Sequence, residues 1–229
     1  MATLHILGVP LDEERELESA TRITILSCDL IVGESRKVTA RFLKGSGVLQ
    51  TDKCWFLDGL KPSEEKDLLA ALKNAKSQNQ DVALFSDTGM PLLFDPGKQI
   101  VRKALALGFR LKSHPGPTSW GTAACLSLWD PPFKIVGFPP RDREERLLFL
   151  KSHTQERSHC LWMDTPYRYQ ALTSQLEETF GGSRPCFLAW EIGKPTERLW
   201  WGTLKELKLF SASQGLEKGE FVLLTEGAK

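Results

Sequence analysis

The sequence predicts an α/β protein built from two α/β domains. In the first half of the 229-residue chain, short apolar runs alternate with helical patterns, as in a mainly parallel sheet with helices on both faces. Fewer helical patterns separate the strands of the second half, which favours a mixed sheet. Between the halves, four prolines within residues 129–140 rule out a continuous helix or a central strand. We therefore predict an N-terminal domain over residues 1–128, a proline-rich linker over 129–140 and a C-terminal domain over 141–229.

Strands in the first domain are expected where apolar residues alternate or cluster before a break, at residues 3–9, 29–32, 54–57, 82–85 and 109–113. A helical pattern follows the acidic residues 12–16 and reaches about residue 28. Further helices are expected over residues 34–44, 64–76, 97–107 and 121–128. Ser35 is a possible cap of the second helix, and Gly45 and Gly47 are expected to end it.

The second domain is expected to begin with a charged helix over residues 141–153. Strands follow at 159–163, 186–192, 198–202 and 221–225, of which the second and third could form a hairpin. Helices are predicted over residues 169–180, ended by Gly181 and Gly182, and over 204–210. The sparser helices are the reason to expect a mixed sheet here.

The composition is that of an ordinary soluble globular protein, with 41% hydrophobic and 26% charged residues. A net charge of +1 gives no overall attraction to polyanions, so any contact with RNA requires a local basic patch. The N-terminal residues lack a basic region followed by a long apolar one, and no apolar run reaches the roughly 18 residues of a membrane span. We therefore expect a cytoplasmic protein without a membrane segment.

Cysteine and histidine give no sign of a metal centre or a disulfide framework. The five cysteines are odd in number, far apart and never in a Cys-x-x-Cys pair. We therefore expect each of them to be buried and to pack as a small apolar residue. The four histidines are scattered, which also disfavours a histidine-based catalytic triad. No dinucleotide-binding glycine motif, phosphate-binding Gly-Lys-Ser/Thr loop or nucleophile elbow is present.

A loop at the end of a predicted strand carries the strongest site signal. After the apolar run 82–85 come Ser86, Asp87 and Gly89, and the loop closes with Asp95 before a helix. Ligands of open α/β sheets bind at such carboxyl ends, where an acid and a glycine can hold a polar small molecule. The alternative is an ordinary turn, in which Gly89 supplies a positive φ and Asp95 caps the helix.

Six short motifs in order give a resemblance to a known family. They are Gly8-Val-Pro10, Ser86-Asp-Thr-Gly-Met-Pro91 with Asp95-Pro-Gly97, Pro115-Gly-Pro-Thr118, Gly137-Phe-Pro-Pro-Arg141 and Thr165-Pro-Tyr-Arg168. Over nearly the whole chain this order resembles the tetrapyrrole methylase superfamily of S-adenosylmethionine-dependent methyltransferases. Within it, the chain is most similar to the branch of ribosomal RNA small-subunit methyltransferase I and its uncharacterised relatives.

The resemblance implies an enzyme that binds S-adenosylmethionine in a cleft between its two domains, usually as a homodimer. Transferred by motif position, the cofactor contacts would be Pro10, Asp87, Gly89, Met90, Thr118, Ser119, Tyr167 and Ala189. The chemistry of the residues agrees in part. The Asp87 carboxylate could pair with the cofactor's amino group or a ribose hydroxyl, and Gly89 lets the backbone approach.

The acceptor implied by the resemblance is RNA, specifically a ribose 2′-hydroxyl of ribosomal RNA. Glu34 is the candidate base for that hydroxyl, against a structural role such as capping or pairing with Arg36. Phosphates could be held by Arg36, Lys37, Arg41 and Arg168; Lys37, Arg41 and Lys44 share one helix face. The alternative is a solvated helix face, which is the preferred interpretation for the charged helix after Arg141 because Glu144 and Glu145 interleave with its arginines.

This chain departs from the RNA-modifying branch in three of these loops. Pro10-Leu-Asp-Glu13 replaces Pro-Ile-Gly-Asn, Glu34-Ser-Arg-Lys37 replaces Glu-Asp-Thr-Arg, and Gly89-Met-Pro-Leu92 replaces Gly-Thr-Pro-Gly. The changes touch the loops expected near the methyl acceptor, so they leave the substrate more open than the cofactor or the fold. Two alternatives therefore stay open: a methylase of small, tetrapyrrole-like molecules, or a cofactor-binding or interaction protein that has lost catalysis.

Among the seven tryptophans, Trp162 and Trp190 lie in predicted strands and are expected in the core. The pair Trp200-Trp201 is expected to be exposed, with a dimer contact or RNA as its partner.

Overall fold

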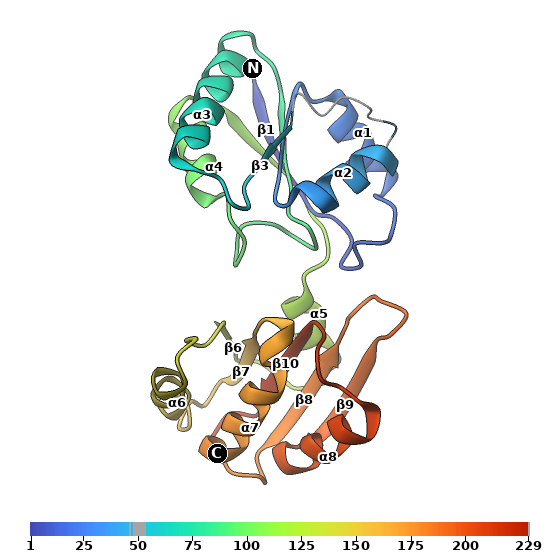
Figure 1. Ribbon diagram of the computed structural model, residues 1–229, viewed down its shortest axis with the longest axis vertical. Coiled ribbons are helices and arrows are strands. Elements are labelled where there is room, and N and C mark those ends of the chain that lie inside the picture. The colour runs from blue at the N-terminus through green and yellow to red at the C-terminus, as the bar shows by residue number, and fades with distance from the viewer. Residues whose placement is uncertain (46, 48–53, 229) are drawn as a thin grey trace. The chain divides into compact units, whose positions relative to one another are not determined.

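The computed structural model describes residues 1–45, 47 and 54–228, and the chain forms two compact units, Met1–Thr118 and Ser119–Lys229 (Figure 1). Each unit contains its own five-stranded sheet, called sheet A in the first unit and sheet B in the second. Two α/β domains, one with a parallel sheet and one with a mixed sheet, were predicted, and both are confirmed.

The division between the units falls earlier than the predicted linker. Residues 129–140 belong to the second unit and contain strand β6 (Phe133–Gly137), which pairs with sheet B along one edge only. Pro131 and Pro132 precede this strand and Pro139 and Pro140 follow it. An edge strand flanked by prolines satisfies the same steric rules as a linker, so composition alone did not separate the two.

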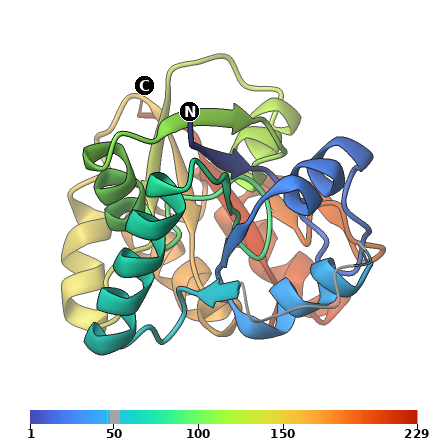
Figure 2. The same ribbon diagram turned by 90° about the horizontal axis from the view of Figure 1, so that it is seen from above.

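Sheet A is wholly parallel, in the order β3-β2-β4-β1-β5. Its strands are β1 (Thr3–Leu7), β2 (Leu30–Gly33), β3 (Cys54–Phe56), β4 (Val82–Leu84) and β5 (Arg110–His114). In Figure 2 the green β5 runs beside the dark blue β1, in agreement with their register. The central strands β1, β2 and β4 are almost entirely buried, as expected for a parallel sheet covered on both faces.

Helices cover both faces of sheet A: α1 (Ser19–Ser27), α2 (Arg36–Gly45), α3 (Pro62–Ser77) and α4 (Lys98–Ala106). One face packs against α3 and α4 through residues such as Leu68, Leu72 and Ile100. The opposite face packs against α1 and α2 through Ile25 and Phe42. The predicted glycine end of α2 is confirmed at Gly45. Helix α3 begins at Pro62, two residues before the predicted start, and the side chain of Glu64 accepts a hydrogen bond from the Lys61 amide there.

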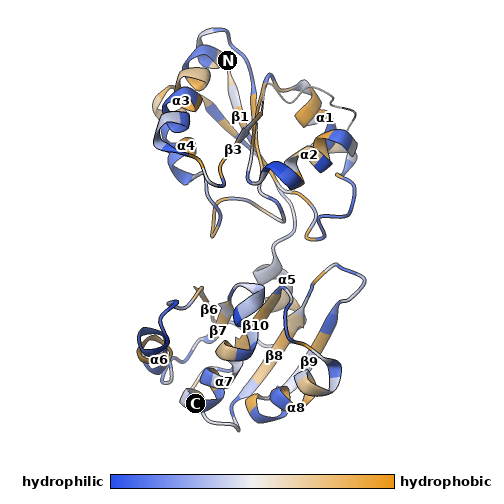
Figure 3. Cartoon of the chain, in the orientation of Figure 1, coloured by the Kyte–Doolittle hydropathy of each residue, from blue (hydrophilic) through white to orange (hydrophobic). Residues whose placement is uncertain are grey.

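Sheet B is mixed, in the order β6-β7-β10-β8-β9, with β6 parallel to β7 and the other pairs antiparallel. Its further strands are β7 (His159–Met163), β8 (Pro185–Trp190), β9 (Arg198–Thr203) and β10 (Phe221–Thr225). The predicted hairpin of β8 and β9 is confirmed. Strand β8 carries mainly hydrophobic side chains (Figure 3) because it lies inside the sheet and is covered on both faces.

Helix α5 (Ser119–Leu126) packs on one face of sheet B through residues such as Ala123. The opposite face is covered by α6 (Arg143–Lys151), α7 (Tyr169–Phe180) and α8 (Leu204–Gln214), with the short η1 (Pro166–Arg168) preceding α7. Trp162 and Trp190 lie in this core as predicted, and Trp162 donates to the Thr225 hydroxyl at 3.0 Å. Of the Trp pair, Trp200 stacks on Phe210, whereas Trp201 is 46% exposed and donates to the Ser127 carbonyl.

The expectation of buried cysteines is confirmed for Cys160 and Cys186 but is wrong for Cys125, which is exposed on α5. Ala123 of α5 is buried against sheet B, and Cys125, two residues further on, lies on the opposite side of the helix. Within residues 1–45, 47 and 54–228, no helix is long and apolar enough to cross a membrane.

A histidine pair links β1 to the edge strand β5. The ring nitrogens His5 Nδ1 and His114 Nε2 lie 2.9 Å apart, so one must donate and the other accept, which requires a neutral ring. Burial, the neighbouring His5 and Lys112 lower the pKa of His114 from its ordinary value. The folded protein therefore disfavours the protonated form of His114.

We expect the first unit to lose stability as the pH falls below about 6.5. In that range the unfolded chain binds a proton at His114 more readily than the folded chain does, so protonation favours unfolding. His114→Gln keeps a donor and an acceptor near His5 but removes the titration. Thermal unfolding at about pH 7.5 and about pH 5.5 measures the effect. An equal pH dependence in the wild type and the variant would contradict this assignment.

Candidate active site

The carboxyl ends of the strands of sheet A bring together the loops that follow β1, β2, β4 and β5, because these strands are parallel. Neighbouring β1 and β4 lead the chain to opposite faces, through α1 after β1 and through α4 after β4. Adjacent parallel strands whose connections diverge in this way mark the usual ligand-binding position of an open α/β sheet. This edge is therefore the candidate active site.

Backbone hydrogen bonds join the loops after β1 and β4. The amide of Val9 donates to the Gly89 carbonyl at 3.0 Å, and the amide of Gly89 donates to the Pro10 carbonyl at 3.2 Å. Gly89 has a φ of +69°, as in the ordinary turn that was the alternative interpretation of this loop, and a Cβ there would lie 3.1 Å from the Pro117 carbonyl oxygen. The structure thus places Pro10 and Gly89, two predicted cofactor contacts, side by side.

The loops after β1 and β5 meet through two glycines. A Cβ on Gly8 would lie 2.4 Å from the Cα of Gly116, and a Cβ on Gly116 would lie 2.6 Å from the Cα of Gly8. The Gly8 amide also donates to the His114 carbonyl at 2.9 Å. Only two residues without side chains allow backbones this close, so both glycines of these motifs are required sterically.

Glu34 and Asp87 join the loops after β2 and β4 by a reciprocal pair of hydrogen bonds. The Asp87 amide donates to Glu34 Oε2 at 3.0 Å, and the Ser35 amide donates to Asp87 Oδ1 at 3.0 Å. The candidate base therefore lies beside the best cofactor candidate, although they are separated by more than 50 residues in sequence. The alternative ion pair between Glu34 and Arg36 does not form. The Arg36 guanidinium instead stacks on the Phe56 ring, with its Cζ 4.5 Å from the ring centre.

Several carboxyl groups share this edge of the sheet. Burial raises the pKa of Glu34, the Asp87 amide opposes that rise, and the carboxylates of Asp95, Asp87 and Asp58 add to it. Burial likewise raises the pKa of Asp95, against a hydrogen bond from Ser86. The N-cap of α4 is Gly97, which has no side-chain cap, so the alternative role of Asp95 as a helix cap is wrong.

The remaining predicted cofactor residues of the first unit lie on the same loops. Met90 packs partly against the core beneath α3 and α4, and Thr118 ends the loop after β5 in a half-buried position. Leu92 adopts a φ of +85°, a backbone conformation that favours glycine. Phe94, two residues further on, is 43% exposed.

Three basic residues lie on the outer face of α2, but their surroundings differ. Lys37 and Lys44 are exposed, and the described residues offer Lys37 no ion pair. Arg41 is half-buried and pairs with Glu14 at 2.8 Å and with Glu13 at 3.6 Å. The predicted face therefore exists, and one of its charges is already engaged by acids from the first loop.

In the second unit, the predicted site residues have contrasting environments. Tyr167 is 76% exposed and lies beneath the Lys218 ammonium at 4.1 Å, which lowers its pKa. Ser119 begins α5 in a half-buried position. Ala189 is completely buried on β8, which lies between β9 and β10, so in this structure its side chain offers no surface to a ligand.

Arg168 is engaged through its whole guanidinium group. Its Nε donates to Asp164 Oδ1 at 2.7 Å, and its terminal nitrogens donate to the carbonyls of Pro140 at 3.1 Å and Pro139 at 3.2 Å. These bonds hold the proline segment after β6 against the end of β7. Contact of Arg168 with RNA stays a prediction. The observed partners of Arg168 all lie within the second unit.

Sequence reasoning missed a second arginine on the same segment. Arg146 of α6 is only 6% exposed and donates to the carbonyls of Pro140 and Arg141 and to Gln175. The expectation of a solvated face for this helix is wrong at Arg146, because the guanidinium replaces water with carbonyl acceptors. Arg146 lies four residues before the buried Leu150 and therefore on the same face of α6, which could have indicated its burial.

No group of three or more histidine, cysteine, aspartate or glutamate side chains suited to a metal ion occurs in the described ranges. A parallel sheet with glycine-rich loops and a half-buried acid at its switch point is the arrangement in which α/β proteins commonly bind a polar small molecule. Residues 3–208 match the family model of Tetrapyrrole (Corrin/Porphyrin) Methylases, and the chain belongs to this family. It is an enzyme of the S-adenosylmethionine-dependent methyltransferases.

The chain is similar in sequence to ribosomal RNA small subunit methyltransferases I. The chain is 29% identical to that of Leptospira borgpetersenii serovar Hardjo-bovis (strain L550), covering 99% of this chain and 88% of the relative. It is 28% identical to that of Mycobacterium tuberculosis (strain ATCC 25618 / H37Rv), covering 97% of this chain and 75% of the relative. The family resemblance drawn from the motifs is thereby confirmed.

Solved structures show the same fold. One is a uroporphyrin-III-C-methyltransferase from Thermus thermophilus, with a TM-score of 0.61 and 16% identity over 98% of this chain and 94% of that chain. Another is a cobalt precorrin-4 methyltransferase of cobalamin biosynthesis, with a TM-score of 0.60, 16% identity and the same coverage. At this identity the similarity concerns the fold alone.

Proposed function

We propose that this protein transfers a methyl group from S-adenosylmethionine to RNA, with a ribose 2′-hydroxyl of ribosomal RNA as the acceptor. The names of its relatives support the RNA substrate. Ribosomal RNA as substrate implies work in the cytoplasm, and the family resemblance implies a homodimer. The single observation that carries the proposal is the reciprocal Glu34–Asp87 contact at the carboxyl edge of sheet A.

The residues at this edge fit S-adenosylmethionine. The half-buried Asp87 carboxylate offers an acceptor for an ammonium or a ribose hydroxyl, and the close approach at Gly8, Gly89 and Gly116 leaves backbone groups within reach of a ligand. The cofactor would be held by Pro10, Asp87, Gly89, Met90 and Thr118 of the first unit. When bound, its sulfonium supplies the electrophilic methyl group.

The protein's own task is then to orient the acceptor and to accept its proton. Glu34 is the proposed proton acceptor, because burial and neighbouring carboxylates raise its pKa and so make it a stronger base than an exposed glutamate. Arg36 and Lys37, both exposed at the start of α2, lie two and three residues after Glu34 and are the proposed phosphate contacts.

Calorimetric titration with S-adenosylmethionine, followed by transfer of a labelled methyl group, tests the proposal. We expect saturable binding and label incorporated into ribosomal RNA or small ribosomal subunits, but not into porphyrin or corrin precursors. Labelling of the tetrapyrroles instead would assign the small-molecule alternative. The absence of cofactor binding would identify a protein that has kept the fold and lost the chemistry.

A further inference from the structure

The first loop of the chain forms a compact acidic turn, which we define as residues 12–15. Asp12 is 7% exposed, and its carboxylate accepts the Glu14 amide at 3.1 Å while its carbonyl accepts the Arg15 amide at 3.1 Å. Such self-bonded aspartates fix the direction in which a turn presents its neighbours. The buried aspartate therefore determines where the next two acids point.

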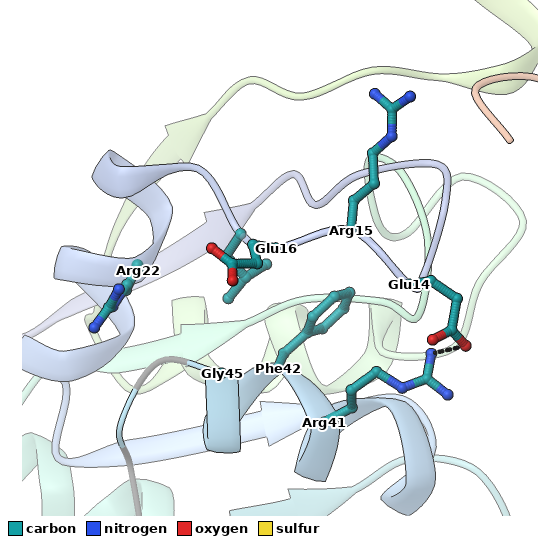
Figure 4. Close-up of a pocket in the computed structure, with 8 residues that line it drawn as sticks. Glu14, Arg15, Glu16, Arg22, Arg41, Phe42 and Gly45 are labelled. Carbon is teal, nitrogen blue, oxygen red and sulfur yellow. Dashed lines mark ion pairs between the residues drawn. The ribbon is translucent and has the colours of Figure 1, made fainter. Parts of the chain in front are cut away.

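Both acids point at one arginine of the basic face. Arg41 Nη1 donates to the Glu13 carbonyl at 3.0 Å and lies 2.8 Å from Glu14 Oε1 and 3.6 Å from Glu13 Oε1. Figure 4 shows the Glu14 carboxylate and the Arg41 guanidinium facing each other beside a small cavity that Phe42 and Arg22 help to line. Three acceptors from a single turn thus converge on one cation.

The contact changes what a phosphate backbone meets on α2. Lys37 lies one helical turn before Arg41, on the same face, and is exposed. The Arg41 guanidinium, in contrast, already has acidic partners, so RNA gains this contact only by displacing them. Ion pairs between partly exposed side chains contribute about 0–1 kcal/mol, which makes the turn displaceable rather than a permanent block.

We propose that Glu13 and Glu14 are specificity-determining residues that compete with RNA phosphates for Arg41. This inference rests on the proposed RNA methyltransferase function and adds a restriction to it. RNA that touches only Lys37 and Arg36 is bound without Arg41 and therefore weakly. RNA that also displaces the acidic turn gains the third cation. The turn thus reduces the binding of arbitrary polyanions, which is specificity through repulsion.

Neutralising the turn is expected to strengthen binding of RNA of arbitrary sequence. With the double variant E13Q/E14Q and a short mixed-sequence RNA duplex as the probe, we expect about fivefold to eightfold tighter binding at about 0.1 M monovalent salt. This range corresponds to about one additional phosphate contact, which releases about 0.7–0.9 of a counterion from the RNA. The plot of log affinity against log salt should steepen by the same 0.7–0.9, approximately. Fluorescence anisotropy measures both quantities.

A matched control separates release of Arg41 from a change in net charge. E16Q/E18Q also removes two negative charges from the loop before α1. Among the described residues, neither Glu16 nor Glu18 forms an ion pair. We expect a change in affinity of about twofold or less for this control, because no ion pair joins either acid to a cation of α2 among the described residues. A gain equal to that of E13Q/E14Q would overturn the proposal.

Removing Arg41 provides the decisive comparison. R41Q alone is expected to change RNA affinity little, and in the E13Q/E14Q background it should abolish the gain. If R41Q weakens the wild type as strongly as Lys37→Glu does, Arg41 already binds RNA and the proposal is overturned.

Failure of the inference and failure of the proposed function give different results. If Lys37→Glu weakens binding and E13Q/E14Q has no effect, the basic face binds RNA and the competing turn is refuted. If neither variant changes RNA affinity and no RNA is methylated, the proposed RNA substrate itself fails. Thermal unfolding of each variant verifies that all are folded.

Discussion

Replacing Glu34 by glutamine is expected to lower the rate constant of methyl transfer to RNA by about 100-fold or more. A ribose hydroxyl is a weak nucleophile until a base accepts its proton, and glutamine cannot serve as that base. The substitution keeps an oxygen that can accept the Asp87 amide, so the contact between the loops after β2 and β4 should survive. Single-turnover methylation with saturating S-adenosylmethionine is the appropriate measurement.

The pH profile of the wild type gives an independent check of the same role. Because burial raises the pKa of Glu34, the proton-accepting carboxylate is lost as the pH falls through a value above that of an ordinary glutamate. We expect methylation to decline as the pH falls through this raised pKa, and the decline to be absent from the residual activity of Glu34→Gln.

Glu34→Ala separates chemistry from architecture. The alanine variant removes both the base and the acceptor for the Asp87 amide, so it should also weaken cofactor binding. If the glutamine variant retained wild-type turnover while the alanine variant lost it, Glu34 would be a positioning residue for Asp87 and the proposed base would be wrong.

Substituting Gly8 by alanine is expected to destabilise the first unit by about 1–3 kcal/mol and to lower its melting temperature by several degrees. The new methyl group would lie 2.4 Å from the Gly116 Cα, and this neighbour is backbone, which cannot rotate away as a side chain can. Relief requires the loops after β1 and β5 to separate, which strains the hydrogen bond from the Gly8 amide to the His114 carbonyl. S-adenosylmethionine affinity should fall as well, because the same loops carry proposed contacts.

Gly45→Ala is the matched control for this substitution. A Cβ at Gly45 would meet no atom of the described residues within 4 Å, and the residue lies at the end of α2 without a positive φ. We expect its stability to change by less than about 1 kcal/mol. Calorimetric unfolding distinguishes the two, with each unit fitted as a separate transition because one two-state fit does not describe two units. Equal melting temperatures for Gly8→Ala and the wild type would contradict the steric argument.

Much of the fold follows from local patterns that the sequence displays directly. The alternation of apolar runs and helical segments predicted the parallel sheet, and the positions of β1, β2, β4 and β7 agree with those runs to within a few residues. The division of the chain was predicted less well. Prolines around β6 suggested a linker, and whether such a segment pairs with a neighbouring strand depends on residues that are distant in sequence.

The features of the candidate site also divide into those that local sequence predicted and those that it did not. Short motifs located the loops, and the positive φ of Gly89 was correctly expected from one residue. The partners of charged side chains were not predictable. Arg41 is separated from Glu13 by 28 residues, and Arg168 from Pro140 by 28, so neither contact leaves a local signal. Arg146 looked solvated because its helix neighbours are acids, yet it is buried against backbone carbonyls.

The sequence by itself determined the fold class, the methyltransferase family and the loops that carry the candidate site, because strand and helix periods and glycine–proline motifs are properties of adjacent residues. Only the tertiary structure decided that Glu34 meets Asp87, that Gly8 touches Gly116 and that acids of the first loop engage Arg41. The physical reason is that parallel strands, joined through long crossovers, bring their carboxyl ends together from distant parts of the chain. Pairing between such loops is set by the order of the strands, which adjacent residues do not encode.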